Sequence, residues 1–77
     1  MSDLVATIRK NSREEIRILL DEFNGAPTFN ARVFWTDAHG EARARHKGLA
    51  FRIDLLPEFA AAVQAALLKA QEQGLLK

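Results

Sequence analysis

Residues 23–51 read FNGAPTFNARVFWTDAHGEARARHKGLAF, and this stretch decides the fold. Its centre, residues 28–36, is rich in aromatic and β-branched side chains, a composition typical of a strand. Asn24-Gly25 before it tolerates the positive φ angles of a tight hairpin, and residues 37–40 form a second turn signal. Residues 41–45 then predict a polar edge strand, and the loose alternation of residues 48–53 predicts another strand.

Residues 12–23 fit two structures. Ser12-Arg13-Glu14-Glu15 fits a capping box, followed by apolar residues at helical spacing. The same stretch alternates as a strand, with Ile16, Ile18 and Leu20 on one face. Taken alone, the pattern favours the helix. We expect residues 1–12 to be a flexible tail and residues 13–77 to form the domain.

The C-terminal part changes to a helical period. Asp54 is a candidate cap, and Pro57 is tolerated in a first helical turn. The apolar stripe that follows consists of Leu56, Phe59, Ala60, Val63, Leu67 and Ala70. Gly74 is placed to end the helix in a left-handed conformation. The sequence therefore predicts one helix from about residue 54 to Gly74.

Size sets a limit on stability. A chain of 77 residues forms one domain, and a domain so small hides only roughly 60% of the surface that its unfolded chain exposes. It holds no cysteine, so disulfides and thiolate metal sites are excluded. We therefore expect a homodimer, with Ala61, Ala65 and Leu68 letting a partner helix come close. The alternative is that alanine is simply a good helix former and one exposed leucine is ordinary.

Charge and targeting signals narrow the class further. The formal charge is +1, but the basic residues of 43–52 have no acid among them, a distribution that concentrates anions locally. A second basic group at residues 9–17 is diluted by acids.

Residues 1–10 lack the order of parts of a signal peptide, and no apolar run approaches the roughly 20 residues that span a bilayer. We expect a soluble cytoplasmic protein without membrane association, bound to the nucleoid if bacterial.

The ordered set Phe23-Asn24-Gly25, Ala31-Arg32-Val33-Phe34-Trp35, Asp37-Ala38-His39-Gly40-Glu41 and His46-Lys47-Gly48-Leu49 resembles the positive-cofactor-four family of transcriptional coactivators. The match covers roughly residues 16–68. It implies an α+β fold, in which a curved, four-stranded antiparallel sheet is followed by one C-terminal helix and two copies form a groove for unpaired DNA strands. It also implies that residues 14–23 are a strand. The implied function is single-stranded DNA binding of low sequence specificity, in transcription regulation or DNA repair.

The resemblance implies a role for particular residues. It assigns base stacking to Phe23 and Trp35, whereas the residues alone favour a place in the core. It assigns phosphate contact to Arg32, Arg43 and Lys47. His46 takes a place that is usually basic, and we expect Arg45 beside it to supply the charge that a histidine often lacks at neutral pH. Strict alternation puts Arg32 and Trp35 on opposite faces, so both meet one ligand only if the strand bulges or ends there. Otherwise Phe34 takes the place of Trp35.

Departures from the family pattern predict modest affinity. Asp21 and Glu22 precede Phe23 where a basic residue is common, and the first turn lacks lysines. Fewer cations give weaker binding and a shallower salt dependence.

Other classes have little support. His39 and His46 lack the partners of a catalytic group, and no glycine-rich phosphate loop is present. Asp37 and His39 fit a solvated turn better than a metal site. We expect no enzyme activity, cofactor or metal. The alternatives are a dimeric protein-interaction adaptor on the same fold, using the basic strand for an acidic partner, and an RNA-binding protein.

Overall fold

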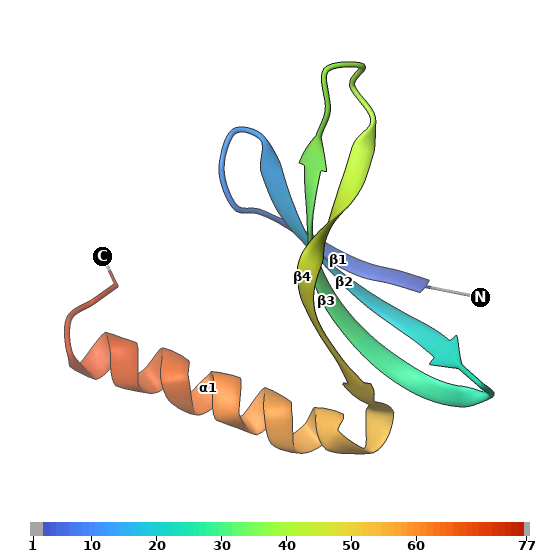
Figure 1. Cartoon of the computed structure of the whole chain (residues 1–77). Coiled ribbons are helices and arrows are strands. Elements are labelled where there is room, and N and C mark those ends of the chain that lie inside the picture. The colour runs from blue at the N-terminus through green and yellow to red at the C-terminus, as the bar shows by residue number, and fades with distance from the viewer. Residues whose placement is uncertain (1–2, 77) are drawn as a thin grey trace.

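The computed structural model describes residues 3–76, apart from the side chain of Lys47. Strands β1 (Asp3–Arg9), β2 (Glu14–Phe23), β3 (Ala26–Thr36) and β4 (Ala42–Arg52) form one sheet in the order β1-β2-β3-β4. All neighbouring strands are antiparallel. A 3₁₀ turn, η1 (Ile53–Leu55), leads into helix α1 (Leu56–Glu72), which extends away from the curved sheet (Figure 1). The expected α+β architecture, with four strands and one C-terminal helix, is confirmed.

The N-terminal segment is not the tail that we expected. Asp3–Arg9 pairs with β2, from Asp3↔Leu20 to Arg9↔Glu15, and forms one edge of the sheet. Val5, Thr7 and Ile8 are β-branched, a composition that suits a strand, and backbone hydrogen bonds to β2 hold the segment at the edge of the sheet. In the turn that follows, Asn11 Oδ1 accepts the backbone N–H groups of Arg13 and Glu14 at 3.0 and 2.9 Å. The prediction of a flexible tail over residues 1–12 is therefore wrong for β1.

The ambiguity over residues 12–23 is resolved in favour of the strand. The β2–β3 ladder runs without a break from Glu14↔Trp35 to Phe23↔Ala26. Asn24 and Gly25 close the hairpin with φ angles of 51° and 79°, as the turn signal predicted. The capping-box pattern belongs to a turn and the start of β2, because backbone pairing with two neighbouring strands outweighs a local helical preference.

The two short strands expected over residues 41–53 are one long strand with an irregularity. In the β3–β4 ladder, Arg32 lies opposite Gly48 and Phe34 lies opposite Ala44. Residues 45–47 therefore face the single residue Val33 across the ladder. Such an excess of residues on one strand is a bulge, which bends the strand and increases its twist. The basic segment of the sequence lies in this bulge.

Helix α1 begins later and ends as predicted. Asp54 lies in η1, the N-cap position is occupied by Leu55, and no side chain caps the helix, so the capping role expected for Asp54 is wrong. Gly74 has φ 69°, and the N–H groups of Gly74 and Leu75 donate to the carbonyl oxygens of Gln71 and Ala70. This is a Schellman end, which needs the left-handed residue that glycine supplies. Within residues 3–76, no helix is both long and apolar enough to cross a membrane.

Three aromatic rings tie the helix to the sheet. Phe29, the single buried residue among those described, is 6% exposed. Its ring centroid lies 5.0 Å from that of Phe51 and 5.8 Å from that of Phe59, and the Phe51 and Phe59 centroids are 5.2 Å apart. Because paired rings at 4.5–7 Å add to the free energy of area burial, this cluster fixes the start of α1 on β3 and β4.

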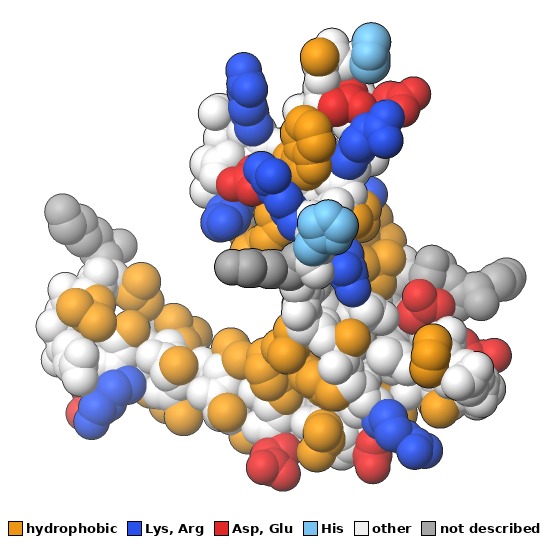
Figure 2. Space-filling view, viewed as in Figure 1, with side chains coloured by type: hydrophobic (Ala, Val, Ile, Leu, Met, Phe, Trp, Pro, Cys, Tyr) orange, Lys and Arg blue, Asp and Glu red, His pale blue; other side chains and the backbone are white. Residues whose placement is uncertain are grey.

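Beyond its first turn the helix is largely uncovered, and residues 60–69 are all exposed. Val63 and Leu67, in the predicted apolar stripe, are 52% and 42% exposed, and Leu68 is 52% exposed. Figure 2 shows apolar side chains along α1 and over the adjacent sheet. The radius of gyration is 14.6 Å, whereas roughly 11.5 Å is expected for a compact domain of this length. The single chain is therefore an open shape with an uncovered apolar surface.

The aromatic cluster predicts where stability is most sensitive. Phe29→Ala should lower the free energy of unfolding by about 3–5 kcal/mol, because it removes a buried ring and leaves a cavity. Phe23→Ala, which removes a ring that is 71% exposed, should cost well under half as much. Chemical denaturation followed by circular dichroism measures both. Equal losses in the two variants would contradict the assignment of the core.

Candidate nucleic-acid interface

The predicted binding residues fall on two faces of the sheet. Because β3 pairs with β2 without a bulge, alternation along β3 is strict, and Arg32 and Trp35 leave opposite faces. Phe23 shares the face of Arg32. Trp35 lies opposite Arg43 in the β3–β4 ladder, so these two side chains share the other face. The bulge that could have brought them together lies on β4 instead of β3.

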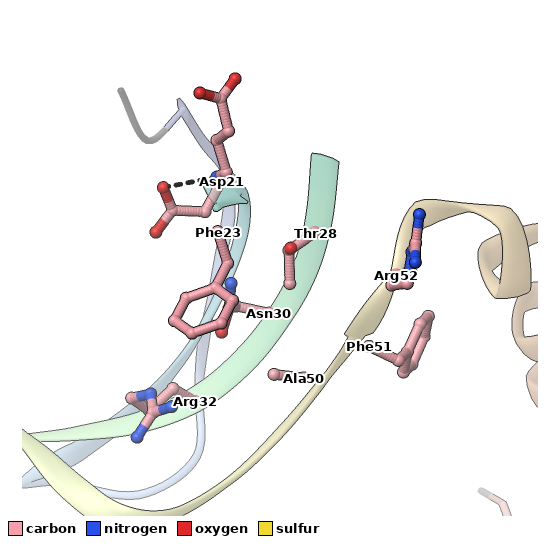
Figure 3. Close-up of a pocket in the computed structure, with 9 residues that line it drawn as sticks. Asp21, Phe23, Thr28, Asn30, Arg32, Ala50, Phe51 and Arg52 are labelled. Atoms are coloured by element: carbon pink, nitrogen blue, oxygen red, sulfur yellow. Dashed lines mark hydrogen bonds between the residues drawn. The ribbon is translucent and has the colours of Figure 1, made fainter. Parts of the chain in front are cut away.

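The first group surrounds a hollow beside the β2–β3 turn, which we call the Phe23 hollow. It has a volume of about 440 Å³ and is lined by Asp21, Glu22, Phe23, Thr28, Asn30, Arg32, Ala50, Phe51 and Arg52. Figure 3 shows the Phe23 ring standing free in it, with Arg32 at one end. An aromatic ring so exposed is available for stacking, and the predicted place of Phe23 outside the core agrees with its 71% exposure.

Gly48 makes room for the side chain of Arg32. A Cβ atom at Gly48 would lie 3.3 Å from both the Ala31 carbonyl oxygen and Arg32 Cζ. The missing side chain lets the guanidinium group cross β4, where Arg32 Nη1 donates to the Arg45 carbonyl oxygen at 3.4 Å. The glycine therefore positions a cation that the sequence assigned to phosphate contact.

The second group lies at the opposite end of the strands, around Trp35. A hollow of about 730 Å³ there, the Trp35 hollow, is lined by Arg9, Ser12, Arg13, Trp35, Thr36, Asp37, Ala38 and His39. The Trp35 side chain is half-buried, and Arg45 Cζ lies 5.2 Å from its ring centroid, within the range of a cation–π contact. Figure 2 shows basic, acidic and histidine side chains mixed at this end.

Arg9 and Arg13 were missed as site residues by the sequence reasoning. They belong to the basic group at residues 9–17, which was set aside because acids dilute it. The turn between β1 and β2 brings them to the Trp35 hollow, as the bond from Thr36 N–H to the Arg13 carbonyl oxygen at 3.1 Å shows. Recognising β1 as a strand would have paired this turn with the β3–β4 turn and revealed them.

Two of the predicted cations are held by carboxylates of the same chain. Arg43 Nε lies 2.6 Å from Asp37 Oδ2, and Arg45 Nε lies 3.1 Å from Glu14 Oε2. The ring of Phe34, the predicted substitute for Trp35, is already in contact with a cation of the same chain. Arg17 Cζ lies 4.4 Å from its centroid, and Arg17 also pairs with Glu15. A phosphate that binds Arg43 or Arg45 therefore has to compete with a carboxylate.

The remaining predicted residues are placed less fully. His46 is exposed and lines a smaller hollow with Lys10, Glu14, Val33 and Arg45. The side chain of Lys47 lies outside the described part of the structure, although its backbone belongs to β4. Ala61, Ala65 and Leu68 are exposed on α1, and their role in a dimer stays a prediction. The assignment of all these residues to binding is likewise a prediction.

Asp37 is a turn residue. Its Oδ1 accepts the backbone N–H groups of His39 and Glu41 at 2.9 and 3.0 Å, and Oδ2 accepts from Arg43. Within residues 3–76, no group of three or more acidic or histidine side chains is arranged to hold a metal ion. Asp37 therefore stabilises the β3–β4 turn and fixes the direction of Arg43.

The two carboxylates that pair with these arginines, Asp37 and Glu14, both have lowered pKa values. The hydrogen bond from Arg43, followed by the backbone N–H of Glu41, lowers the pKa of Asp37 below its ordinary value of 3.8. The side-chain hydrogen bond from Asn11, with smaller contributions from Arg45 and Lys10, lowers the pKa of Glu14 below 4.5. Since both groups prefer the ionised form in the folded chain, they stabilise it at neutral pH, and this contribution is lost as the pH falls through the lowered pKa values.

The Asp37–Arg43 pair predicts a measurable pKa change. A pH titration of the Asp37 carboxyl carbon by NMR should give a pKa below 3.8, and Arg43→Ala should raise that pKa because it removes the largest stabilising contact of the anion. Arg45→Ala, which removes a neighbouring cation that pairs with Glu14, should leave it unchanged. An Asp37 pKa that does not respond to Arg43→Ala would show that the pair does not persist in solution.

Comparison with known proteins places the fold. No protein-family model and no curated protein matches the sequence. Among solved structures, a PC4 homolog from Burkholderia pseudomallei is 25% identical with a TM-score of 0.73, and the match covers 92% of each chain. PC4 is positive cofactor four, so the resemblance predicted from the sequence is confirmed.

Two further solved structures share the fold at lower identity. The bacteriophage T5 homolog of the eukaryotic transcription coactivator PC4, implicated in recombination-dependent DNA replication, is 20% identical with a TM-score of 0.61, over 99% of this chain and 82% of that one. MoSub1, solved in complex with DNA, is 19% identical with a TM-score of 0.61, over 90% of this chain and 84% of that one.

Proposed function

We propose that this PC4-like protein binds single-stranded DNA with low sequence specificity, as a homodimer, and serves transcription or DNA processing. The observation that carries the proposal is the exposed Phe23 ring in a hollow flanked by Arg32 and Arg52. An unpaired strand offers phosphates and exposed base faces, and a ring between cations matches both. The DNA complex of MoSub1 and the part of the T5 homolog in DNA replication support a DNA ligand.

The Trp35 hollow extends the same chemistry to the other end of the sheet. It combines an aromatic ring with Arg9 and Arg13, and it lies beside the bulge that carries Arg45 and His46. Because the Trp35 ring leaves the opposite face of the sheet from Phe23, the two hollows offer an unpaired strand two separate contacts, each with a ring and cations. Because Arg43 and Arg45 are paired with acids, part of the attraction to phosphate is offset. The protein therefore binds with modest affinity, and its proposed role is binding and not catalysis.

Dimer formation follows from the uncovered apolar surface. Val63 and Leu67 form a larger exposed apolar stripe on α1 than the small residues Ala61 and Ala65 do. Burial of such side chains contributes roughly 25 cal/mol per Å² of apolar surface. We place the helix–helix contact on Val63 and Leu67. The set predicted from the sequence, Ala61, Ala65 and Leu68, lies together on the other side of α1, beside Lys69, and serves the contact only if the partner helix crosses there.

Binding of a fluorescent oligothymidine at several salt concentrations tests the function. Phe23→Ala should weaken binding by roughly 5- to 100-fold through the loss of stacking, without changing the slope of log K against log salt. Arg32→Ala should make that slope shallower by about 0.7, the value for one lost phosphate contact on a single strand. Lys47→Ala should do the same if its cation contacts phosphate. Trp35→Ala should behave like Phe23→Ala.

Controls separate the proposal from its alternatives. Lys69→Ala removes a cation of the last turn of α1, far from both hollows, and should leave affinity and slope unchanged. Competition with oligouridine and with duplex DNA identifies the preferred strand type. A protein that serves only as an adaptor for acidic proteins would give no saturable oligothymidine binding at any salt concentration.

A further inference from the structure

One feature of the Phe23 hollow does not suit a general phosphate-binding groove: the carboxylate of Asp21. It lies on the same face as Phe23, one alternation earlier on β2, and opposite Thr28 of β3. Beside phosphates, a carboxylate repels the ligand. The hollow therefore loses affinity at Asp21 unless the ligand brings hydrogen-bond donors to it.

Asp21 is oriented and still able to accept. The backbone N–H of Glu22 donates to Asp21 Oδ1 at 2.8 Å and fixes the side chain (Figure 3). Among the side chains that the structure describes, no cation lies within salt-bridge distance of Asp21, whereas Glu14, Glu15 and Asp37 each pair with an arginine. A carboxylate has about four acceptor sites, and one is used here.

The neighbours of Asp21 in the hollow supply the other groups that a stacked base would meet. Phe23 supplies a flat ring, Asn30 supplies an amide that donates and accepts, and Arg32 and Arg52 supply cations at either side. Asn30 lies two residues beyond Thr28 on the same face of β3, next to the row that holds Asp21. A ring, a carboxylate and an amide that line one hollow are the kinds of group that stack on a base and hydrogen-bond to its edge.

We propose, on the basis of the function proposed above, that the Phe23 hollow is a recognition site for guanine in an unpaired strand. Guanine presents N1–H and the N2 amino group side by side, and these two donors match the two oxygens of the Asp21 carboxylate. Its O6 accepts from the Asn30 amide, and its ring stacks on Phe23. Adenine and cytosine place an acceptor beside their amino group, and thymine offers one donor between two carbonyl groups.

The affinity for oligothymidine with one central guanine tests this site. Replacement of the central thymine by guanine should tighten binding roughly 5- to 100-fold, the range for a bidentate base contact. Adenine at that position should give a much smaller gain, because it stacks as well as guanine does but lacks the paired donors. Inosine, which lacks the N2 amino group, should lose most of the gain. Equal gains from guanine, adenine and inosine would mean stacking alone and would overturn the proposal.

Two matched variants identify the residue responsible. Asp21→Asn should tighten binding of plain oligothymidine, because it removes a repulsive charge, and should abolish the guanine preference. Glu58→Gln removes the same charge from the first turn of α1, outside the lining of the hollow, and should keep the preference. A guanine preference that survives Asp21→Asn would overturn the assignment. Absence of binding to any of the oligonucleotides would instead overturn the proposed function itself.

Discussion

The contact among Phe29, Phe51 and Phe59 is the one on which the rest of the structure depends. It is the place where helix and sheet close over a buried side chain, and it lies at the first turn of α1. Residues 60–69 of the helix, which follow it, are all exposed. Because folding must offset roughly 1–2 kcal/mol of backbone entropy for each ordered residue, so small a core gives the single chain little stability of its own. Association of two chains through α1 is the physical solution that the exposed apolar stripe offers.

The second constraint is the contrast between a regular β3 and an irregular β4. Strict alternation on β3 separates Phe23 and Arg32 from Trp35, so the two hollows lie on different faces and at different ends of the strands. The bulge on β4 holds the basic residues 45–47, at a point where a bulge increases the twist of the strand. A flexible single strand adapts to contacts that do not lie on one straight line, whereas bending a duplex costs deformation energy.

Acids limit and shape the charge of this surface. Asp37 and Glu14 hold Arg43 and Arg45 in fixed directions, and Asp21 stands free within the Phe23 hollow. The first two reduce attraction to phosphate while keeping the cations ordered. Asp21 favours binding only of a base that presents hydrogen-bond donors to its carboxylate. The near-zero net charge of the chain thus reflects acids that lie among the cations.

Local signals in the sequence predicted much of this fold. The Asn24-Gly25 hairpin, the aromatic strand around Val33 and the glycine end of α1 follow from turn chemistry and composition. The strand β1 was missed although Val5, Thr7 and Ile8 give it the β-branched composition of a strand, because its place in the sheet depends on pairing with β2, which the stretch does not show by itself. The bulge on β4 was equally hidden, so one strand was predicted as two. In the candidate site, alternation correctly separated Arg32 from Trp35, but the acid partners of Arg43 and Arg45 required the three-dimensional arrangement.

The central claim, that a second copy completes the core, is tested most directly by the midpoint of thermal unfolding as a function of protein concentration. If folded chains are dimers through α1, the midpoint rises with concentration, because dilution favours dissociated, unfolded chains. Leu67→Glu should lower the midpoint, and Lys69→Glu, on the polar side of the helix, should keep it near that of the original chain. A midpoint independent of concentration, together with a mass of 8.6 kDa in solution, would contradict the account.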